Sequence, residues 1–297
     1  MARVSRYSRH SNQSRRKSSA GGRRAIKILW WVFILGTISL VSLVLMVDAG
    51  WMGYMPSMAE LENPNSAISS DVIANDGTTV IGRYYVLDRS TSKFPEISPN
   101  VISALLATED ARFYEHSGID AIGTIAIPFY VLTGKKRGSS TITQQLAKNL
   151  FPRKNESKLT LPLIKLKEWI MAVKLEKNLT KNEIITLYLN IVPFSDNVYG
   201  IKNASMTFFN KTPDKVSIEE AAVLIAMLKA NSVYNPRTHP DRAMERRNTV
   251  LEQMAKYKYI SEPEATKLQQ NLLFWITINW ITMRVWLLTS VWFWSSR

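Results

Sequence analysis

Two neighbouring carboxylates with a histidine close behind them mark one stretch of the chain as a candidate for chemistry. Glu109 and Asp110 are adjacent, and Phe113, His116 and Gly118 follow within the next nine residues. Carboxylates and imidazoles are the side chains that most often transfer protons in enzymes. Adjacent acids at a helix end can equally be an ordinary cap, so this stretch by itself leaves catalysis and capping both open.

Hydroxyl and amide side chains gather further along the chain. The run begins at Gly138 and contains, in order, Ser140, Thr141, Gln144, Gln145 and Lys148. Such a concentration of hydrogen-bond donors suits phosphate or sugar oxygens. A Ser/Thr cap on a helix with a polar face explains the same residues, so the run has two interpretations.

A lysine and a glutamate three residues apart form the third candidate. Lys165 and Glu168 share a face if this segment is helical. A surface salt bridge, which contributes little stability, explains this pair without any chemistry.

The charge of the chain is concentrated at its start. Its 297 residues include 38 basic and 24 acidic side chains, a formal charge of +14. Residues 1–27 hold nine of the basic side chains and no acid, which leaves +5 for the other 270 residues. The basic composition is therefore that of one tail, and we expect no nucleic-acid partner. The absence of cysteine excludes disulfides, thiolate zinc sites and cysteine nucleophiles.

A long apolar run follows the basic tail. Residues 28–47 carry no charge and are long enough to span a bilayer as a helix. Because the basic residues precede this run, the positive-inside rule predicts a cytoplasmic N-terminus and an external remainder. A cleaved signal peptide is the alternative, but the run is long for one and the Val47–Gly50 sequence is a poor cleavage site.

The remaining elements predict a mainly α protein with a small β element before it. We expect a stalk and a small β region over residues 48–95, with a hairpin whose strands flank Asn75–Gly77. From 96 to 270 the apolar spacing is helical, with a helix starting at Ser98–Asn100. Another helix is expected to bury the stripe formed by Leu166, Ile170 and Val173.

One nearly uncharged segment is too short to cross a membrane. Residues 119–132 contain a single charge, that of Asp120. The segment is either a buried helix with a loop or a part of the chain that dips into the membrane surface.

Taken together and in order, the three runs resemble the peptidoglycan glycosyltransferases of family 51, found in class A penicillin-binding proteins and monofunctional transglycosylases. The first run resembles their EDxxFxxHxG signature, the second GxSTxTQQ and the third RKxxE. Two further similar stretches, residues 181–190 and 229–236, follow, and Arg246–Asn248 closes the set. The resemblance covers about residues 70–270 and implies a lysozyme-like glycosyltransferase domain.

Two positions depart from the family pattern. Ile164 stands where the third signature has arginine, which removes one phosphate contact. The glycine-rich stretch expected after the fourth motif reads as residues 192–200 and keeps only its last glycine, Gly200. Neither departure removes a carboxylate.

The resemblance implies a reaction and a role for each matched residue. Such enzymes polymerise lipid II into β-1,4-linked glycan strands with inversion and release undecaprenyl pyrophosphate. Glu109 matches the general base and Glu168 the second catalytic carboxylate, which assists the leaving group directly or through a divalent ion. The matched pyrophosphate contacts are Lys148 and Lys165, and the residues matched to the donor site are Ser140, Thr141, Gln144 and Gln145. The matched structural residues are Asp110, Phe113, His116, Gly118 and Gly138, with His116 as an architectural hydrogen bonder and not the base.

The resemblance also implies the surroundings of the enzyme. Its partners would be lipid II, the growing glycan strand, the membrane and other cell-wall synthesis proteins. It leaves a magnesium or manganese ion open as a cofactor. A single-pass protein of the bacterial inner (plasma) membrane, with its catalytic domain outside, fits a substrate that stays attached to the bilayer.

The C-terminal end of the sequence does not fit a transpeptidase. Ser90–Lys93 and Ser195–Asn197 match two transpeptidase motifs only as strings, and no K-T-G exists. Residues 271–297 form an atypical tail with five tryptophans. We interpret the tail as the product of a reading-frame shift near Leu273, a hypothesis that resequencing the locus tests.

Two other functions remain open at the level of sequence. One is a lysozyme-like hydrolase that cleaves the same strands, which the length of the product would distinguish. The other is an inert anchored module that binds lipid II, which Ile164 and the atypical tail favour and the two carboxylates argue against.

Overall fold

The computed structural model describes residues 20–56, 70–73, 80–84, 91–126, 140–151 and 160–270. The chain divides into two units, Met1–Met55 and Pro56–Arg297. Gly138, part of the apolar segment 119–132 and the tail 271–297 lie outside the described residues.

The first unit contains helix α1, Ala20–Asp48. The stretch Gly22–Asp48 has a mean hydropathy of 2.4. Among the described residues, it is the one helix that is long enough and apolar enough to cross a membrane. The helix begins eight residues before the predicted apolar run 28–47. This difference arises because hydropathy registers the charges of Arg23, Arg24 and Lys27, whereas these residue types are good helix formers.

Two short strands precede the helical body of the second unit. Strands β1 (Ser70–Ile73) and β2 (Val80–Tyr84) pair antiparallel, with Ser70 opposite Tyr84 and an irregularity between Val72 and Ile73. The turn predicted at Asn75–Gly77 lies outside the described residues.

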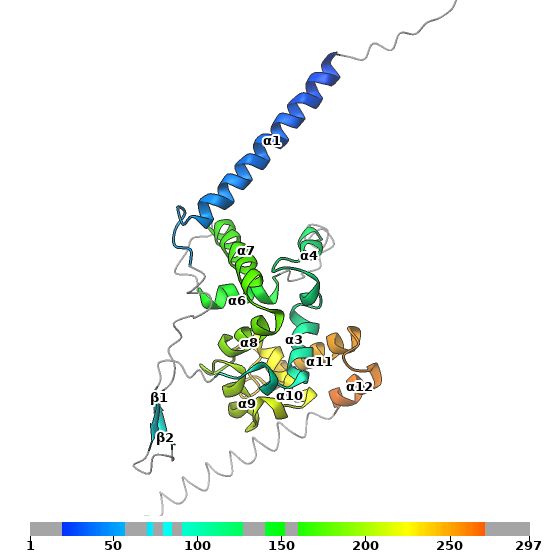
Figure 1. Cartoon of the computed structure of the whole chain (residues 1–297). Helices are drawn as coiled ribbons and strands as arrows, with labels where there is room; N and C mark the ends of the chain where they lie inside the picture. The colour runs from blue at the N-terminus through cyan, green and yellow to red at the C-terminus, as the bar shows by residue number, and fades with distance from the viewer. Residues whose placement is uncertain are drawn as a thin grey trace, which may run out of the picture. The chain divides into compact units, whose positions relative to one another are not determined.

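The body itself is built from helices (Figure 1). Its elements are, in order, η1 (Phe94–Glu96), α3 (Pro99–Glu109), η2 (Phe113–Glu115), α4 (Ala121–Ile125), α6 (Ile142–Leu150), α7 (Leu161–Asn178), α8 (Lys181–Ile191), α9 (Ile201–Phe209), η3 (Pro213–Lys215), α10 (Ile218–Leu228), α11 (Pro240–Lys256) and α12 (Glu262–Gln270). The mainly α class predicted from the sequence is confirmed.

Helix α10 forms the centre of the core. Every residue from Ala221 to Met227 is buried, and α3 and α11 pack against α10 and against each other. Helix α3 starts as predicted: Ser98 accepts a hydrogen bond from the Asn100 backbone N–H, and Pro99 occupies the first turn, where its missing donor costs nothing. This packing positions α3 in the body and thereby positions Glu109, the last residue of α3.

Helix α7 buries a different face from the one predicted. Leu166, Ile170 and Val173 are only half-buried. The buried residues are Ile164, Glu168, Met171, Ala172 and Leu175. Apolar residues occur on more than one side of this helix, so periodicity did not identify the inner face, and the inner face includes a carboxylate. Ile164, the residue in place of the family's arginine, therefore packs into the body.

The described part of the second polar run forms the start of α6 and the residues just before it. Helix α6 packs against both α7 and α8. The start of α6 is also joined to the end of α3, because Asp110 accepts the Ile142 backbone N–H, and to α7, because Ser140 accepts from Lys165.

Candidate active site

Glu109, at the end of α3, is half-buried and is held by a chain of two hydrogen bonds. Nε2 of Gln145 on α6 donates to its Oε2 at 2.8 Å, and the Tyr188 hydroxyl on α8 donates to Oε1 of Gln145 at 3.0 Å. Burial raises the pKa of the Tyr188 phenol well above its usual value, and the negative charge of Glu109 raises it further. Tyr188 lies in the matched stretch 181–190, for which the sequence predicted a helix and no chemical role. The missed signal is that a tyrosine on a buried helix face needs a partner for its hydroxyl.

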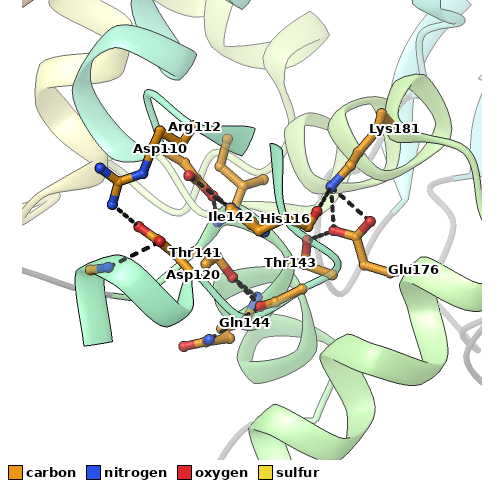
Figure 2. Close-up of polar contacts among 12 residues, drawn as sticks. Asp110, Arg112, His116, Asp120, Thr141, Ile142, Thr143, Gln144, Glu176 and Lys181 are labelled. Atoms are coloured by element: carbon orange, nitrogen blue, oxygen red, sulfur yellow. Dashed lines mark hydrogen bonds and ion pairs between the residues drawn. The ribbon is translucent and has the colours of Figure 1, made fainter. Parts of the chain in front are cut away.

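Asp110 joins the first polar run to the second (Figure 2). Its Oδ2 accepts the backbone N–H of Ile142, the first residue of α6, at 3.1 Å. A carboxylate at this point satisfies a free donor and complements the helix dipole. Both oxygens of Asp110 also lie 3.0–3.1 Å from Nε2 of His116. Because an ionised Asp110 only accepts, Nε2 of His116 carries a proton.

Gly118 is required where the chain crosses α7. Its φ is +87°, and an added Cβ would lie 2.9 Å from the backbone carbonyl atoms of Ala172. Its carbonyl accepts hydrogen bonds from Thr141 Oγ1 at 2.7 Å and Gln144 Nε2 at 3.2 Å. Thr141 and Gln144 are themselves buried. Their side chains hold the backbone here, and their predicted contact with substrate stays a prediction.

Lys181 ties the same stretch to α7 and α8 (Figure 2). Its ammonium donates to the His116 carbonyl at 2.6 Å and to Glu176 at 2.8–2.9 Å, and lies 4.2 Å from the centre of the Phe113 ring. Glu176 in turn accepts from Thr143 Oγ1 at 2.6 Å. Neither Glu176 nor Lys181 was predicted from the sequence to have a role of its own. The i,i+5 separation of that lysine and glutamate across a helix break gave no recognisable signal.

Glu168 lies on the buried face of α7, 2% exposed, beside a lysine. Nζ of Lys165 donates to Glu168 Oε2 at 2.8 Å and to Ser140 Oγ at 2.9 Å. Ser140 lies two residues before α6, which also contains Gln145. The short stretch from Ser140 to Gln145 therefore contacts Glu109 directly through Gln145. It is linked to Glu168 only indirectly, because Ser140 accepts from the Lys165 ammonium that also donates to Glu168.

The other predicted ligands are placed less fully. Lys148, one turn after Gln145, is exposed, and no hydrogen bond or ion pair joins its side chain to another described residue. Gly138 lies outside the described residues. Among the residues with known placement, no group of three or more His, Cys, Asp or Glu side chains is arranged to hold a metal ion.

The beginning of the apolar segment 119–132 forms the short helix α4. Asp120 caps it by accepting the Gly123 backbone N–H at 3.0 Å, and it also pairs with Arg112. Burial raises the pKa of Asp120, but the Gly123 hydrogen bond and the Arg112 guanidinium outweigh it and keep the pKa below its usual value. Ile122 and Ile125 on α4 are exposed, at 69% and 79%.

The stretch that departs from the glycine-rich family pattern forms a tight turn. Asp196 and Asn197 both have φ of +58°, and Pro193 bridges to Tyr199. Two positive φ values define the hairpin turns that favour Asn, Asp and Gly. These two residues thus supply the left-handed conformation that glycine commonly supplies. Gly200 is retained because a Cβ there would lie 2.6 Å from the Asn190 carbonyl oxygen.

Arg247, in the closing motif, is a structural residue. Its side chain is fully buried and donates to the carbonyls of Leu268 and Gln269 at the end of α12, at 3.2 and 3.0 Å, and to Asn248. Burial lowers its pKa to about 10. The guanidinium therefore stays charged at neutral pH and caps α12.

Comparison with known proteins identifies the group to which this sequence is related. The transglycosylase family model matches residues 77–255. Penicillin-binding protein 1F of Bacillus subtilis (strain 168) is 41% identical over 207 residues, which is 69% of this chain and 28% of the relative. Penicillin-binding protein 1A of Escherichia coli (strain K12) is 36% identical over 212 residues, which is 71% of this chain and 24% of the relative. The chain thus spans about a quarter of the length of these curated relatives.

A crystal structure of penicillin-binding protein 1A from Haemophilus influenzae also matches. The identity is 21% and the TM-score 0.37, over 69% of this chain and 20% of that one. A similarity this weak supports no argument about the fold. The family match covers more than half of the chain and contains every carboxylate described above. This chain therefore belongs to the transglycosylase family.

Proposed function

We propose that this chain is a peptidoglycan glycosyltransferase that polymerises lipid II into β-1,4-linked glycan strands for bacterial cell-wall synthesis. The observation that carries the proposal is the placement of two carboxylates, Glu109 and Glu168, around one polar stretch at the start of α6. An inverting transfer needs a base for the acceptor hydroxyl and positive charge or donors for the departing pyrophosphate. The two carboxylate environments match these two needs.

Glu109 is the proposed general base. It is half-buried, so a substrate hydroxyl can reach it, and the amide of Gln145 holds it in place by donating a hydrogen bond to one carboxylate oxygen. It removes the proton from the 4-hydroxyl of the acceptor N-acetylglucosamine. An electron pair on the deprotonated hydroxyl oxygen then forms the new bond to the anomeric carbon of the donor. At the same time the bond from that carbon to the pyrophosphate oxygen breaks, and its electrons leave with undecaprenyl pyrophosphate.

The leaving group is proposed to bind near Glu168. Lys165 is held between Glu168 and Ser140, and its side chain is 36% exposed, so its ammonium is accessible to a ligand. Lys148 adds a second, exposed cation on α6. An ammonium close to a departing pyrophosphate stabilises the charge that develops on it. Glu168 keeps Lys165 in place and is the second catalytic carboxylate.

The other matched residues are proposed to support these groups. Thr141 and Gln144 anchor the Gly118 carbonyl, and Gln145 contacts Glu109. The pairing of His116 with Asp110 at the start of α6 supports an architectural role for His116, not that of a base. A magnesium or manganese ion remains an expectation of the family resemblance, and no step above requires one.

The proposed location is the bacterial inner membrane. Helix α1 would serve as a single-pass anchor with the basic tail in the cytoplasm and the catalytic domain outside. The exposed Ile122 and Ile125 on α4 favour a segment that touches the membrane surface over a buried one. Lipid II, the glycan strand and other cell-wall synthesis proteins are the proposed partners, and residues 96–270 the lysozyme-like catalytic domain.

Polymerisation of labelled lipid II by the full chain in detergent tests the proposal. The unaltered chain should form long glycan, and Glu109→Gln should lower the rate about 10²–10⁴-fold because a general base is lost. Glu168→Gln should also lower it, by leaving the Lys165 ammonium without its carboxylate. Glu115→Gln, at an exposed acid on η2, is the matched control and should retain full activity.

Two outcomes would contradict the proposal in different ways. Release of short fragments from preformed glycan, without polymer, would indicate the hydrolase. Binding of lipid II with no product from the unaltered chain would indicate the inert module.

A further inference from the structure

A buried phenol lies two hydrogen bonds behind the candidate base. Tyr188 is 1% exposed and comes from α8, Gln145 comes from α6 and Glu109 ends α3. The hydroxyl donates to Oε1 of Gln145 at 3.0 Å, and Nε2 of the same amide donates to Glu109 at 2.8 Å. The three side chains therefore form one directed chain that crosses three helices.

The direction of this chain depends on the charge of Glu109. An ionised carboxylate only accepts hydrogen bonds, so the amide must turn its NH₂ toward Glu109 and its oxygen toward Tyr188. The opposite orientation would place the amide oxygen against the carboxylate. A protonated Glu109 can donate, and then both amide orientations form hydrogen bonds, because a phenol both donates and accepts.

The phenol supplies the donor that the first orientation needs at the amide oxygen. Burial and the charge of Glu109 both raise the pKa of Tyr188, so its hydroxyl keeps its proton as a donor. Helix α8, which carries Tyr188, also buries Ile184, Ile185 and Leu189 in the body.

We propose that Tyr188 is a positioning residue that orients the Gln145 amide toward Glu109 and thereby favours the ionised, proton-accepting form of that carboxylate. The inference rests on the proposed role of Glu109 as general base. Tyr188 touches neither substrate nor reacting atoms in this role and acts only through Gln145.

The test removes the hydroxyl alone. Tyr188→Phe in the full chain should lower kcat for lipid II polymerisation about three- to tenfold, the effect of one hydrogen bond, with KM unchanged. The acid limb of the rate profile should move to higher pH, because the ionised base loses a supporting donor. Tyr259→Phe, at a partly exposed tyrosine, is the matched control and should change neither quantity. Melting temperatures of both variants report whether the fold is retained.

A double-mutant cycle tests the route of the effect. The double variant Gln145→Met/Tyr188→Phe should have the same kcat and the same acid limb of the pH–rate profile as the single variant Gln145→Met. Additive effects of the two changes would overturn the proposal, as would a Tyr188→Phe chain that melts lower but keeps an unaltered pH profile.

A second measurement does not depend on turnover. Carbodiimide labelling of Glu109, followed by mass spectrometry as pH is varied, should have its midpoint at higher pH in Tyr188→Phe than in the unaltered chain. An unchanged midpoint would overturn the positioning role even if the chain makes no polymer. Absence of polymer with a shifted midpoint would instead count against the proposed function and leave the positioning role standing.

Discussion

The two carboxylates of the candidate site differ in what surrounds them. Glu109 is half-buried and faces a neutral amide donor, whereas Glu168 is buried and faces an ammonium. Paired carboxylates commonly take different roles because their environments favour different protonation states and partners. This difference is the residue-level reason to assign proton removal to Glu109 and leaving-group support to the Lys165–Glu168 pair.

Gly118 provides a test of the backbone that surrounds the site. Gly118→Ala should destabilise the body by about 1–3 kcal/mol, because the position combines positive φ with a contact against backbone that cannot move away. Thermal unfolding followed by circular dichroism measures the change. Activity should fall with it, since Thr141 and Gln144 both bind the Gly118 carbonyl.

Gly36→Ala is the matched control for that substitution. An added Cβ at Gly36, in α1, meets nothing within 4 Å. Its melting temperature should equal that of the unaltered chain. Equal melting temperatures for both alanine variants would contradict the claim that Gly118 lies too close to the backbone of α7 to carry a Cβ.

At the scale of elements, short polar contacts join helices that are distant in sequence. Asp110 at the end of α3 caps the start of α6, and Ser140 before α6 accepts from Lys165 on α7. The loop at Asp196 is held in the same way, because Asn235 donates to its carboxylate at 2.8 Å. Many residues of the family motifs therefore form hydrogen bonds that connect one helix to another.

The joint at Arg247 yields a prediction for α12. Arg247→Met should destabilise the body by about 2–3 kcal/mol, because the last carbonyls of α12 lose a charged donor. Limited proteolysis should cut first within 262–270. The stability of Arg247→Lys should lie between that of the unaltered chain and that of Arg247→Met, since one ammonium cannot replace both donors of the planar guanidinium. Protection of α12 equal to that of the unaltered chain in Arg247→Met would contradict the capping role.

At the scale of the whole molecule, an apolar helix and a helical body with the candidate active site occur in one chain. The proposed substrate, lipid II, stays in the bilayer, so α1 as the proposed membrane anchor would keep the chain in the same layer as that substrate. The exposed Ile122 and Ile125 add apolar surface to the body itself. These features agree with the proposed membrane location.

Removal of the atypical tail tests how much of the chain the body needs. The last described helix, α12, ends at Gln270 with its carbonyls already bound by Arg247. A chain without residues 271–297 should therefore melt at the same temperature and polymerise lipid II at the same rate as the full chain. A lower melting temperature would mean that the tail contributes to the core.

Much of this protein was predictable because local rules act over a few residues. The apolar run within α1, the Ser98–Pro99 start of α3 and the helical class follow from hydropathy and capping. The motifs also identified Glu109 and Glu168 as candidate catalytic residues, because they match the carboxylates of the family signatures. Periodicity failed on α7, where apolar residues surround the helix and the true inner face carries Glu168.

The sequence by itself determined the family, the helical class and the candidate carboxylates, because residue types and their spacing are local properties. Only the tertiary structure decided that Tyr188 reaches Glu109 through Gln145, that Lys181 binds the His116 carbonyl, and that Asp196 takes a glycine-like conformation. The physical reason is that these contacts join elements far apart in the chain. Their hydrogen bonds are set by how the helices pack and not by neighbouring residues.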